Sequence, residues 1–179
     1  MGYYVRSIHS NFFMDKVHFD AAYKKLCELN DYDELKRGGQ FGSGIKEEND
    51  KYNKNKWFSW MDYNYPETCP DMFSVLSQVG FGFDHDDEGN LVSLYYDDNK
   101  TGNEDYFLCA LAPFVKDGSF IVFKGEEDDD YFRYIFKDGY MYLERGQTEI
   151  TWVSPSKYEF GKLSETDLYL KNLFAKESV

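Results

Sequence analysis

Apolar residues recur along the chain at intervals of three and four in some stretches and of two in others. From Asp15 to Asn30 the interval is three and four, which predicts an amphipathic helix whose polar residues face water. Its apolar side is formed by Phe19, Ala22, Tyr23, Leu26 and Leu29.

Two more helices are expected in the middle of the chain. One runs over 71–79, with Thr68 as its N-cap and Gly80 at its end, and buries Met72, Phe73, Leu76 and Val79. The other runs over about 103–112, buries Phe107, Leu108 and Leu111, and stops at Pro113, because proline cannot continue a helix.

A further amphipathic helix is expected at about 164–175. Its apolar side could dock on the sheet or be presented to a partner, and the pattern leaves both readings open.

Short alternating or aromatic-rich stretches separated by turn residues predict strands. They lie at 3–8, 57–63, 81–83, 91–96, 120–124, 131–137, 140–144 and 149–153. The last four follow one another as a meander, with Lys137-Asp-Gly139 as one of the turns. The sequence therefore predicts an α+β fold: a mostly antiparallel sheet with a C-terminal β-meander and three to four helices packed on it.

Residues 31–56 interrupt these patterns. A glycine-rich stretch at 38–44 is followed by polar residues of alternating charge at 46–56, which predicts a long polar surface loop or insertion. With 179 residues, the chain suits a single domain, 1–179, that carries this loop.

Composition favours a folded, cytoplasmic protein. No apolar run approaches the roughly 20 residues that cross a bilayer, and the first residues contain no apolar stretch of the kind a signal peptide needs. The three cysteines, Cys27, Cys69 and Cys109, lack CxxC spacing, which argues against disulfides and a zinc site. Cys27 and Cys109 fall in helical patterns, where buried thiols are expected.

Motifs that would support catalysis or a cofactor are not recognisable in the sequence. Asp84-x-Asp86-x-Glu88-Gly89 resembles the start of a calcium loop, but position twelve is Tyr95 instead of a bidentate carboxylate, so a solvated hairpin turn is expected. We expect no catalytic residues, no metal, no cofactor and no direct binding of nucleic acid or membranes.

The distribution of charge is the strongest functional signal. The net charge of the chain is −13, and residues 84–130 alone carry 3 Lys and Arg against 14 Asp and Glu, a net charge of −11. Such a surface repels nucleic acid and attracts basic proteins.

If strand 91–96 leads through helix 103–112 to strand 120–124 as one crossover, the loops 97–105 and 125–130 meet at one end of the sheet, and the turn 84–90 lies at the other. Nine acids would then share that end, next to Tyr131 as an aromatic contact. These acids are Asp97, Asp98, Glu104, Asp105, Glu126, Glu127, Asp128, Asp129 and Asp130. Either they form a binding surface or they keep the loops soluble, and the sequence leaves both readings open.

Four stretches together resemble a largely uncharacterised group of small acidic proteins from phages, prophages and mobile elements. They are Tyr3-Tyr-Val5, Cys27-Glu-Leu-Asn30, Leu111-Ala-Pro-Phe-Val-Lys-Asp-Gly-Ser-Phe120 and Arg133-Tyr-Ile-Phe-Lys-Asp-Gly139. The resemblance covers about residues 1–30 and 70–153, and it supplies no catalytic residue. It implies a context that includes anti-CRISPR proteins and other inhibitors of host defence.

Three functional hypotheses follow. The first is a non-enzymatic inhibitor that blocks a basic nucleic-acid-binding site on a host defence nuclease or another nucleic-acid-binding protein. The second is an immunity protein that neutralises a basic toxin. The third, which the sequence favours least, is a metal-dependent module or enzyme.

Overall fold

The computed structural model describes residues 3–39, 50–97, 99–127 and 130–146. The chain divides into two units, Met1–Gln147 and Thr148–Val179. The first unit contains the fold described below. The strand expected at 149–153 and the helix expected at 164–175 lie outside the described residues.

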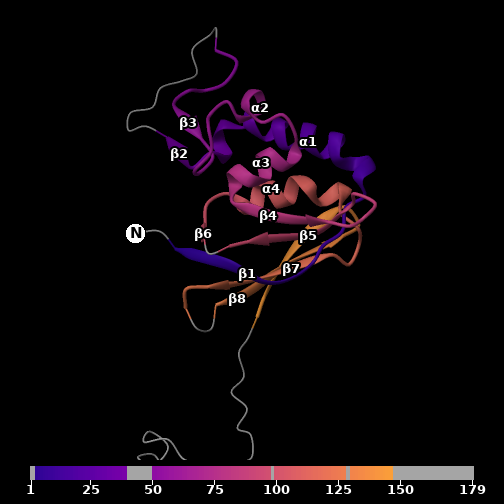
Figure 1. Ribbon diagram of the computed structural model, residues 1–179. Helices are drawn as coiled ribbons and strands as arrows, with labels where there is room; N and C mark the ends of the chain where they lie inside the picture. The colour runs from indigo at the N-terminus through magenta and orange to yellow at the C-terminus, as the bar shows by residue number, and fades with distance from the viewer. Residues whose placement is uncertain (1–2, 40–49, 98, 128–129, 147–179) are drawn as a thin grey trace, which may run out of the picture. The chain divides into compact units, whose positions relative to one another are not determined.

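A five-stranded sheet forms one layer of the first unit (Figure 1). Its order is β6-β1-β7-β8-β9, and each neighbouring pair is antiparallel. The strands are β1 (Tyr4–Asn11), β6 (Asn99–Lys100), β7 (Phe120–Gly125), β8 (Tyr131–Lys137) and β9 (Tyr140–Arg145). The last three correspond to the first three strands of the expected meander, and Asp138, with φ 54°, and Gly139, with φ 76°, make the tight turn between β8 and β9.

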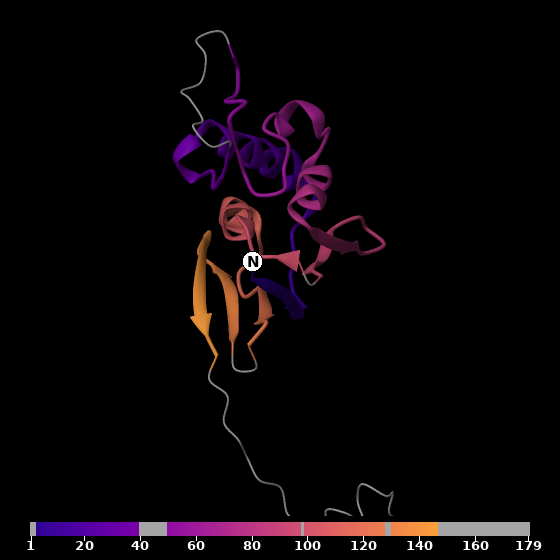
Figure 2. The ribbon, with the colours of Figure 1, turned by 90° about the vertical axis from the view of Figure 1, so that its left-hand side faces the viewer.

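Helices cover one face of this sheet. Helix α4 (Glu104–Leu111) lies against the sheet, and α1 (Phe19–Glu28) packs on α4 and on α3 (Met72–Val79), as two perpendicular views show (Figure 2). The fold is therefore α+β with a mostly antiparallel sheet, as the sequence predicts.

Shorter elements complete the unit. A separate hairpin pairs β4 (Phe81–His85) with β5 (Leu91–Tyr96), and β2 (Gly38–Gly39) pairs with β3 (Lys56–Trp57). The remaining helices are short: α2 (Tyr65–Thr68), η1 (Lys16–His18), η2 (Leu29–Asp31), η3 (Asp33–Leu35) and η4 (Ala112–Phe114).

The core lies between α4, the other helices and the sheet. Its largest fully buried side chains are aromatic: Phe12, Phe58, Tyr65, Tyr96, Phe107, Phe123 and Phe136. Many of them meet edge to face, as Phe58 and Phe107 do at 5.1 Å between ring centroids, a geometry that aromatic quadrupoles favour. The high aromatic content of the sequence is thus used mainly for packing.

The strand expected at 57–63 is wrong. Only Lys56–Trp57 pairs with another strand, and the chain then turns, with Trp60 at φ 67° and 64% exposed. Phe58 and Met61 are the buried residues, a spacing of three that is incompatible with strand alternation. The strand was predicted from the aromatic content of 57–63, and the observed burial of these residues does not alternate as it would in a strand.

The start of the second expected helix also differs. Thr68 ends the short helix α2, and Asp71 is the N-cap of α3, because its Oδ1 accepts a hydrogen bond of 2.7 Å from the backbone N–H of Ser74. Gly80 ends the helix with φ 110°, as expected. Phe73, which was expected to be buried, is only partly buried, whereas Val75, which was not expected to be buried, is fully buried.

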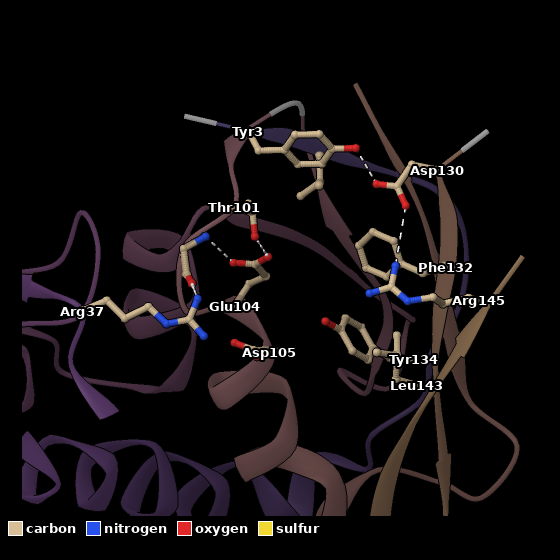
Figure 3. A pocket seen from close by; sticks show the side chains of 12 residues that line it. Tyr3, Arg37, Thr101, Glu104, Asp105, Asp130, Phe132, Tyr134, Leu143 and Arg145 are labelled. Atoms are coloured by element: carbon tan, nitrogen blue, oxygen red, sulfur yellow. Dashed lines mark hydrogen bonds and ion pairs between the residues drawn. The ribbon is translucent and has the colours of Figure 1, made fainter. Parts of the chain in front are cut away.

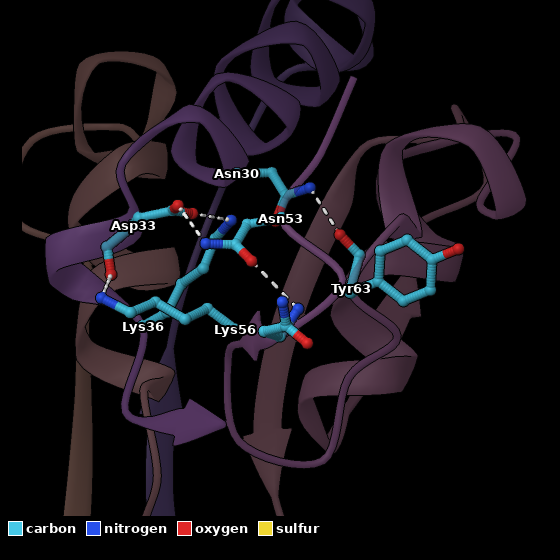
Figure 4. A network of polar contacts seen from close by, with 7 residues as sticks. Asn30, Asp33, Lys36, Asn53, Lys56 and Tyr63 are labelled. Atoms are coloured by element: carbon cyan, nitrogen blue, oxygen red, sulfur yellow. Dashed lines mark hydrogen bonds and ion pairs between the residues drawn. The ribbon is translucent and has the colours of Figure 1, made fainter. Parts of the chain in front are cut away.

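The described parts of the segment 31–56, which the sequence predicts as a polar surface loop or insertion, are held by a polar network. Figure 4 shows the network: Asp33 accepts from the Nζ of Lys36 at 2.7 Å and from the Nδ2 of Asn53 at 2.7 Å. Lys36 and Asn53 are both buried. Asn30, just before this segment, donates to the carbonyl oxygen of Tyr63 at 2.8 Å. Polar residues that look solvated in the sequence therefore form hydrogen bonds within the fold, although the buried Oδ1 of Asn30 has no partner among the described residues.

The expectation of buried cysteines holds in neither helix. Cys109 on α4 is exposed, and Cys27 on α1 is half-buried, whereas Cys69 is buried between α2 and α3. Periodicity places a residue on a helix, but neighbouring elements decide which faces are covered.

Candidate functional site: the end of the sheet at Val5

The register of β1 brings the acidic segments together. Val5 pairs with Asn99 of β6 on one side and with Gly125 of β7 on the other. The loops that contain residues 97–105 and 125–131 therefore lie at the same end of the sheet. We call this end the Val5 end.

The turn 84–90 lies at the opposite end. Leu91, directly after this turn, bridges to Met14, which follows the other end of β1. The crossover invoked from the sequence started from the wrong strand, because β5 pairs with β4 and is not a member of the five-stranded sheet. The strand that enters the sheet is β6, and α4 connects it to β7 across β1.

The acids at the Val5 end differ in exposure. Asp97, Glu126 and Glu127 are exposed. Glu126 Oε1 also accepts a hydrogen bond of 2.8 Å from the backbone N–H of Tyr4. Asp98, Asp128 and Asp129 lie outside the described residues. Tyr131 is half-buried, with Lys124 Nζ 5.5 Å from its ring centroid.

Glu104 has a structural role. Its side chain is buried, and its carboxylate accepts hydrogen bonds from the Thr101 hydroxyl at 2.5 Å and from the Gly102 N–H at 2.6 Å. A carboxylate at the first turn of α4 is also favoured by the helix dipole. Because its oxygens are used internally, Glu104 does not contribute a free charge to the surface.

A pocket of about 200 Å³ opens at this end, between the start of α4 and the sheet (Figure 3). It is lined by segments far apart in the sequence: Tyr3, Val5, Arg37, Thr101, Gly102, Glu104, Asp105, Asp130, Phe132, Tyr134, Leu143 and Arg145. Three of the acids expected at one end thus lie around one cavity.

Two arginines stand at the edges of the pocket. Arg37 donates to the carbonyl oxygen of Gly102 at 3.4 Å and lies over the ring of Tyr106. Arg145 lies 3.8 Å from Asp130, which also accepts a hydrogen bond of 2.5 Å from the Tyr3 hydroxyl. This hydrogen bond is the main cause that raises the pKa of Tyr3. Asp130 is therefore partly neutralised within the chain.

Asp105 is the pocket's least compensated acid. Burial raises the pKa of its carboxyl group, and the nearby Glu104 raises it further. Its Oδ1 accepts from the backbone N–H of Tyr106, and Asp105 forms no ion pair with another described residue. Attraction to Arg37 opposes this rise in the pKa without cancelling it, so the charge of Asp105 is only partly compensated in a partly desolvated place.

Sequence reasoning missed Arg37, Tyr134 and Arg145. The signal for Arg145 was present in the meander, since its register sets Arg145 opposite Phe132. Arg37 belongs to the segment 31–56, which the sequence analysis assigned to a loop, so no local pattern indicated that it lines the pocket.

The calcium-like turn has the interactions of a hairpin turn. Asp86 Oδ1 accepts from the backbone N–H groups of Glu88 at 3.0 Å and of Asn90 at 2.8 Å. The Nδ2 of Asn90 also donates to the Asp86 Oδ2 at 3.0 Å, and this bond is the main cause that lowers the pKa of Asp86, with the backbone bonds adding to it. Within the described ranges, no three His, Cys, Asp or Glu side chains are grouped so as to hold a metal ion.

Comparisons with known proteins return no family model, no curated protein and no solved structure that significantly matches the chain. The resemblance to phage proteins therefore remains a hypothesis based on the four sequence stretches. In the part of the chain that the structure describes, no helix combines the length and apolar character needed to span a bilayer.

Proposed function

We propose that this protein is a non-enzymatic inhibitor that covers a basic nucleic-acid-binding surface of another protein with its Val5 end. The observation that carries the proposal is the double pairing of Val5, which gathers two acidic segments at one place. Exposed carboxylates at that place, on Asp97 and Glu127, form no ion pair with described residues.

Charge density supports a cationic partner. At physiological salt the screening length is about 8 Å, so carboxylates on adjacent loops act together on an approaching surface. Cations at the same end, among them Lys100 and Lys124, lie over the rings of Tyr4 and Tyr131 and compensate only part of this charge. A groove built for phosphates offers the complementary charge.

The context of the proposal comes from the resemblance to small acidic phage proteins. In that context the partner is a bacterial defence nuclease, and the site of action is the cytoplasm. The protein would act by occupying the surface that the nuclease uses for DNA or RNA.

The test measures inhibition directly. The protein is expressed in bacterial strains that each carry one nuclease-based defence system, and phage plating efficiency is measured. For a nuclease that is inhibited, displacement of labelled nucleic acid from the purified enzyme is then titrated at several salt concentrations. Failure to inhibit any nuclease of this panel would contradict the proposal.

Two variants of equal charge change locate the surface. Asp97→Asn/Glu126→Gln/Glu127→Gln neutralises the Val5 end, and Asp84→Asn/Asp87→Asn/Glu88→Gln neutralises the exposed turn at the opposite end. The first variant should weaken inhibition about tenfold, because several exposed charges each contribute a fraction of a kcal/mol, and should flatten the salt dependence. If both variants weaken inhibition equally, net charge alone is responsible and the Val5 end is not the site.

A further inference from the structure

The pocket at the Val5 end is lined by a tyrosine hydroxyl group that no described residue uses. Tyr134 on β8 is 8% exposed, and its hydroxyl makes no hydrogen bond with any described residue. In Figure 3 this hydroxyl points across the pocket toward the side on which Glu104 and Asp105 lie. Because the hydroxyl faces the pocket and no described residue uses it, it is available to a ligand as donor or acceptor.

The chemistry around this hydroxyl favours a cation with hydrogen-bond donors. Asp105 offers a half-buried carboxylate without an ion pair among the described residues. The lining contains three carboxylates and two guanidinium groups, a formal charge of −1. Burial keeps the Tyr134 phenol protonated by raising its pKa, so its oxygen is a neutral acceptor.

The walls of the pocket suit a ligand with an apolar chain and a charged end group. Phe132, Leu143 and the ring of Tyr3 line the pocket beside the polar groups. A guanidinium group fits such surroundings better than an ammonium group, because it is planar, weakly hydrated and able to donate to two acceptors at once.

We propose that this pocket receives the guanidinium group of an arginine side chain, which donates to Asp105 and to the Tyr134 hydroxyl. The inference rests on the proposed function, since the arginine belongs to the basic partner that covers the Val5 end. It makes the interaction specific, because the exposed acids attract any cationic surface whereas the pocket accepts one side chain.

Arg37 and Arg145 do not fill this role themselves. Arg37 is engaged with the Gly102 carbonyl and the Tyr106 ring, and Arg145 lies beside Asp130 with its side chain 73% exposed. Neither forms an ion pair with Asp105.

The test needs no partner protein. N-acetyl-L-arginine amide, the uncharged N-acetyl-L-citrulline amide and acetate are each titrated into the full chain, and amide chemical shifts are followed by NMR. Saturable binding of the arginine derivative in the millimolar range is expected, with citrulline at least about tenfold weaker, because the charged hydrogen bonds are lost. Equal binding of both compounds, no binding of either, or binding of acetate in place of the arginine derivative would overturn the inference.

Variants separate the site from general charge. Asp105→Asn should weaken binding of the arginine derivative about tenfold and Tyr134→Phe several-fold, whereas Asp87→Asn, an equal charge change at the opposite end, should leave it unchanged. Both pocket variants are checked for folding by their NMR spectra. If the two folded variants bind like the unmodified chain, the pocket is not the arginine site.

The two proposals fail separately. Loss of inhibition in the Asp97/Glu126/Glu127 variant, combined with a pocket that does not bind arginine, contradicts only the pocket. Binding of arginine in the pocket, combined with undisturbed inhibition by the same variant, contradicts only the proposed function.

Discussion

Lys36 and Asp33 form an ion pair of 2.7 Å between Nζ and Oδ1, in which the lysine side chain is fully buried and the aspartate side chain is 34% exposed. Asn53 donates to the other oxygen of the same carboxylate. The two described parts of the segment 31–56, before and after residues 40–49, are thereby held to each other, and the same arrangement orders the chain that leads to Arg37 at the pocket.

Removing Asp33 should destabilise the fold strongly. Asp33→Ala leaves the ammonium group of Lys36 buried without a counter-charge, and we expect a loss of about 2–3 kcal/mol in the free energy of unfolding, below the range for fully buried pairs because water reaches Asp33. Urea denaturation measures this loss. As a control, Glu28→Gln breaks the exposed Lys25–Glu28 pair and should cost less than about 1 kcal/mol. Equal losses in the two variants would show that the buried pair is no more important than the exposed one.

A methyl group at Gly80 should be costly for two reasons. Its φ of 110° is unfavourable for residues with a Cβ, and that Cβ would lie 3.0 Å from the Asn99 Nδ2 and 3.1 Å from the Tyr96 Cε2. We expect Gly80→Ala to lower the unfolding free energy by about 2–3 kcal/mol. Gly118 has a φ of 85°, but a Cβ added there would have no atom within 4 Å. Gly118→Ala should therefore show only the backbone cost, about 1 kcal/mol of unfolding free energy. A larger loss at Gly118 than at Gly80 would refute the argument from contacts.

Two buried tyrosines should respond differently to loss of the hydroxyl group. The Tyr65 hydroxyl donates to the Leu26 carbonyl at 2.6 Å, so Tyr65→Phe leaves a buried acceptor unsatisfied and should cost about 1–3 kcal/mol. The Tyr134 hydroxyl has no described partner, so Tyr134→Phe should change thermal or urea stability by less than about 0.5 kcal/mol or increase it. A large loss at Tyr134 would mean that its hydroxyl is already satisfied and would weaken the case for an arginine site.

Asp105 should make stability depend on pH with an unusual sign. Its pKa is raised in the folded state, chiefly by burial, so the folded state binds the proton more tightly. The stabilisation from the protonated form is complete below the ordinary pKa of about 3.9 and is lost as the pH rises through the raised value. Asp105→Asn should therefore be more stable than the unmodified chain at pH 7, and the difference should vanish in acid. Urea denaturation at both pH values measures it.

Asp71 provides the opposite case for comparison. The hydrogen bond from the Ser74 backbone N–H is the main cause that lowers the pKa of Asp71, so its stabilisation is present above the ordinary pKa and is lost as the pH falls through the lowered value. Asp71→Ala should cost about 1 kcal/mol at pH 7 through loss of the cap and less in acid. If Asp105→Asn also destabilises the chain at pH 7, its charge is compensated in a way that the pocket does not show.

Local sequence patterns were sufficient for much of the fold. Residues 131–137 and 140–144 alternate around an Asp-Gly turn, and the structure has strands there because such pairing needs only neighbouring residues. Gly80 likewise ends its helix for a local reason. The prediction of a strand at 57–63 was wrong because packing against α4 decides which residues of this segment are buried. The contact of Phe58 with Phe107 of α4 is an example.

The sequence by itself determined the α+β class, the meander and the concentration of negative charge in residues 84–130. Periodicity, turn residues and composition are local properties, and each can be read without knowing what lies nearby in space. Only the tertiary structure decided which acids are exposed, which support α4 and which line a pocket. Glu104 and Asp105 are adjacent in the sequence, yet the first is satisfied by Thr101 and Gly102 while the second forms no ion pair with a described residue. That difference depends on strand register and on residues such as Arg37 and Tyr134, which long-range contacts bring to the same cavity.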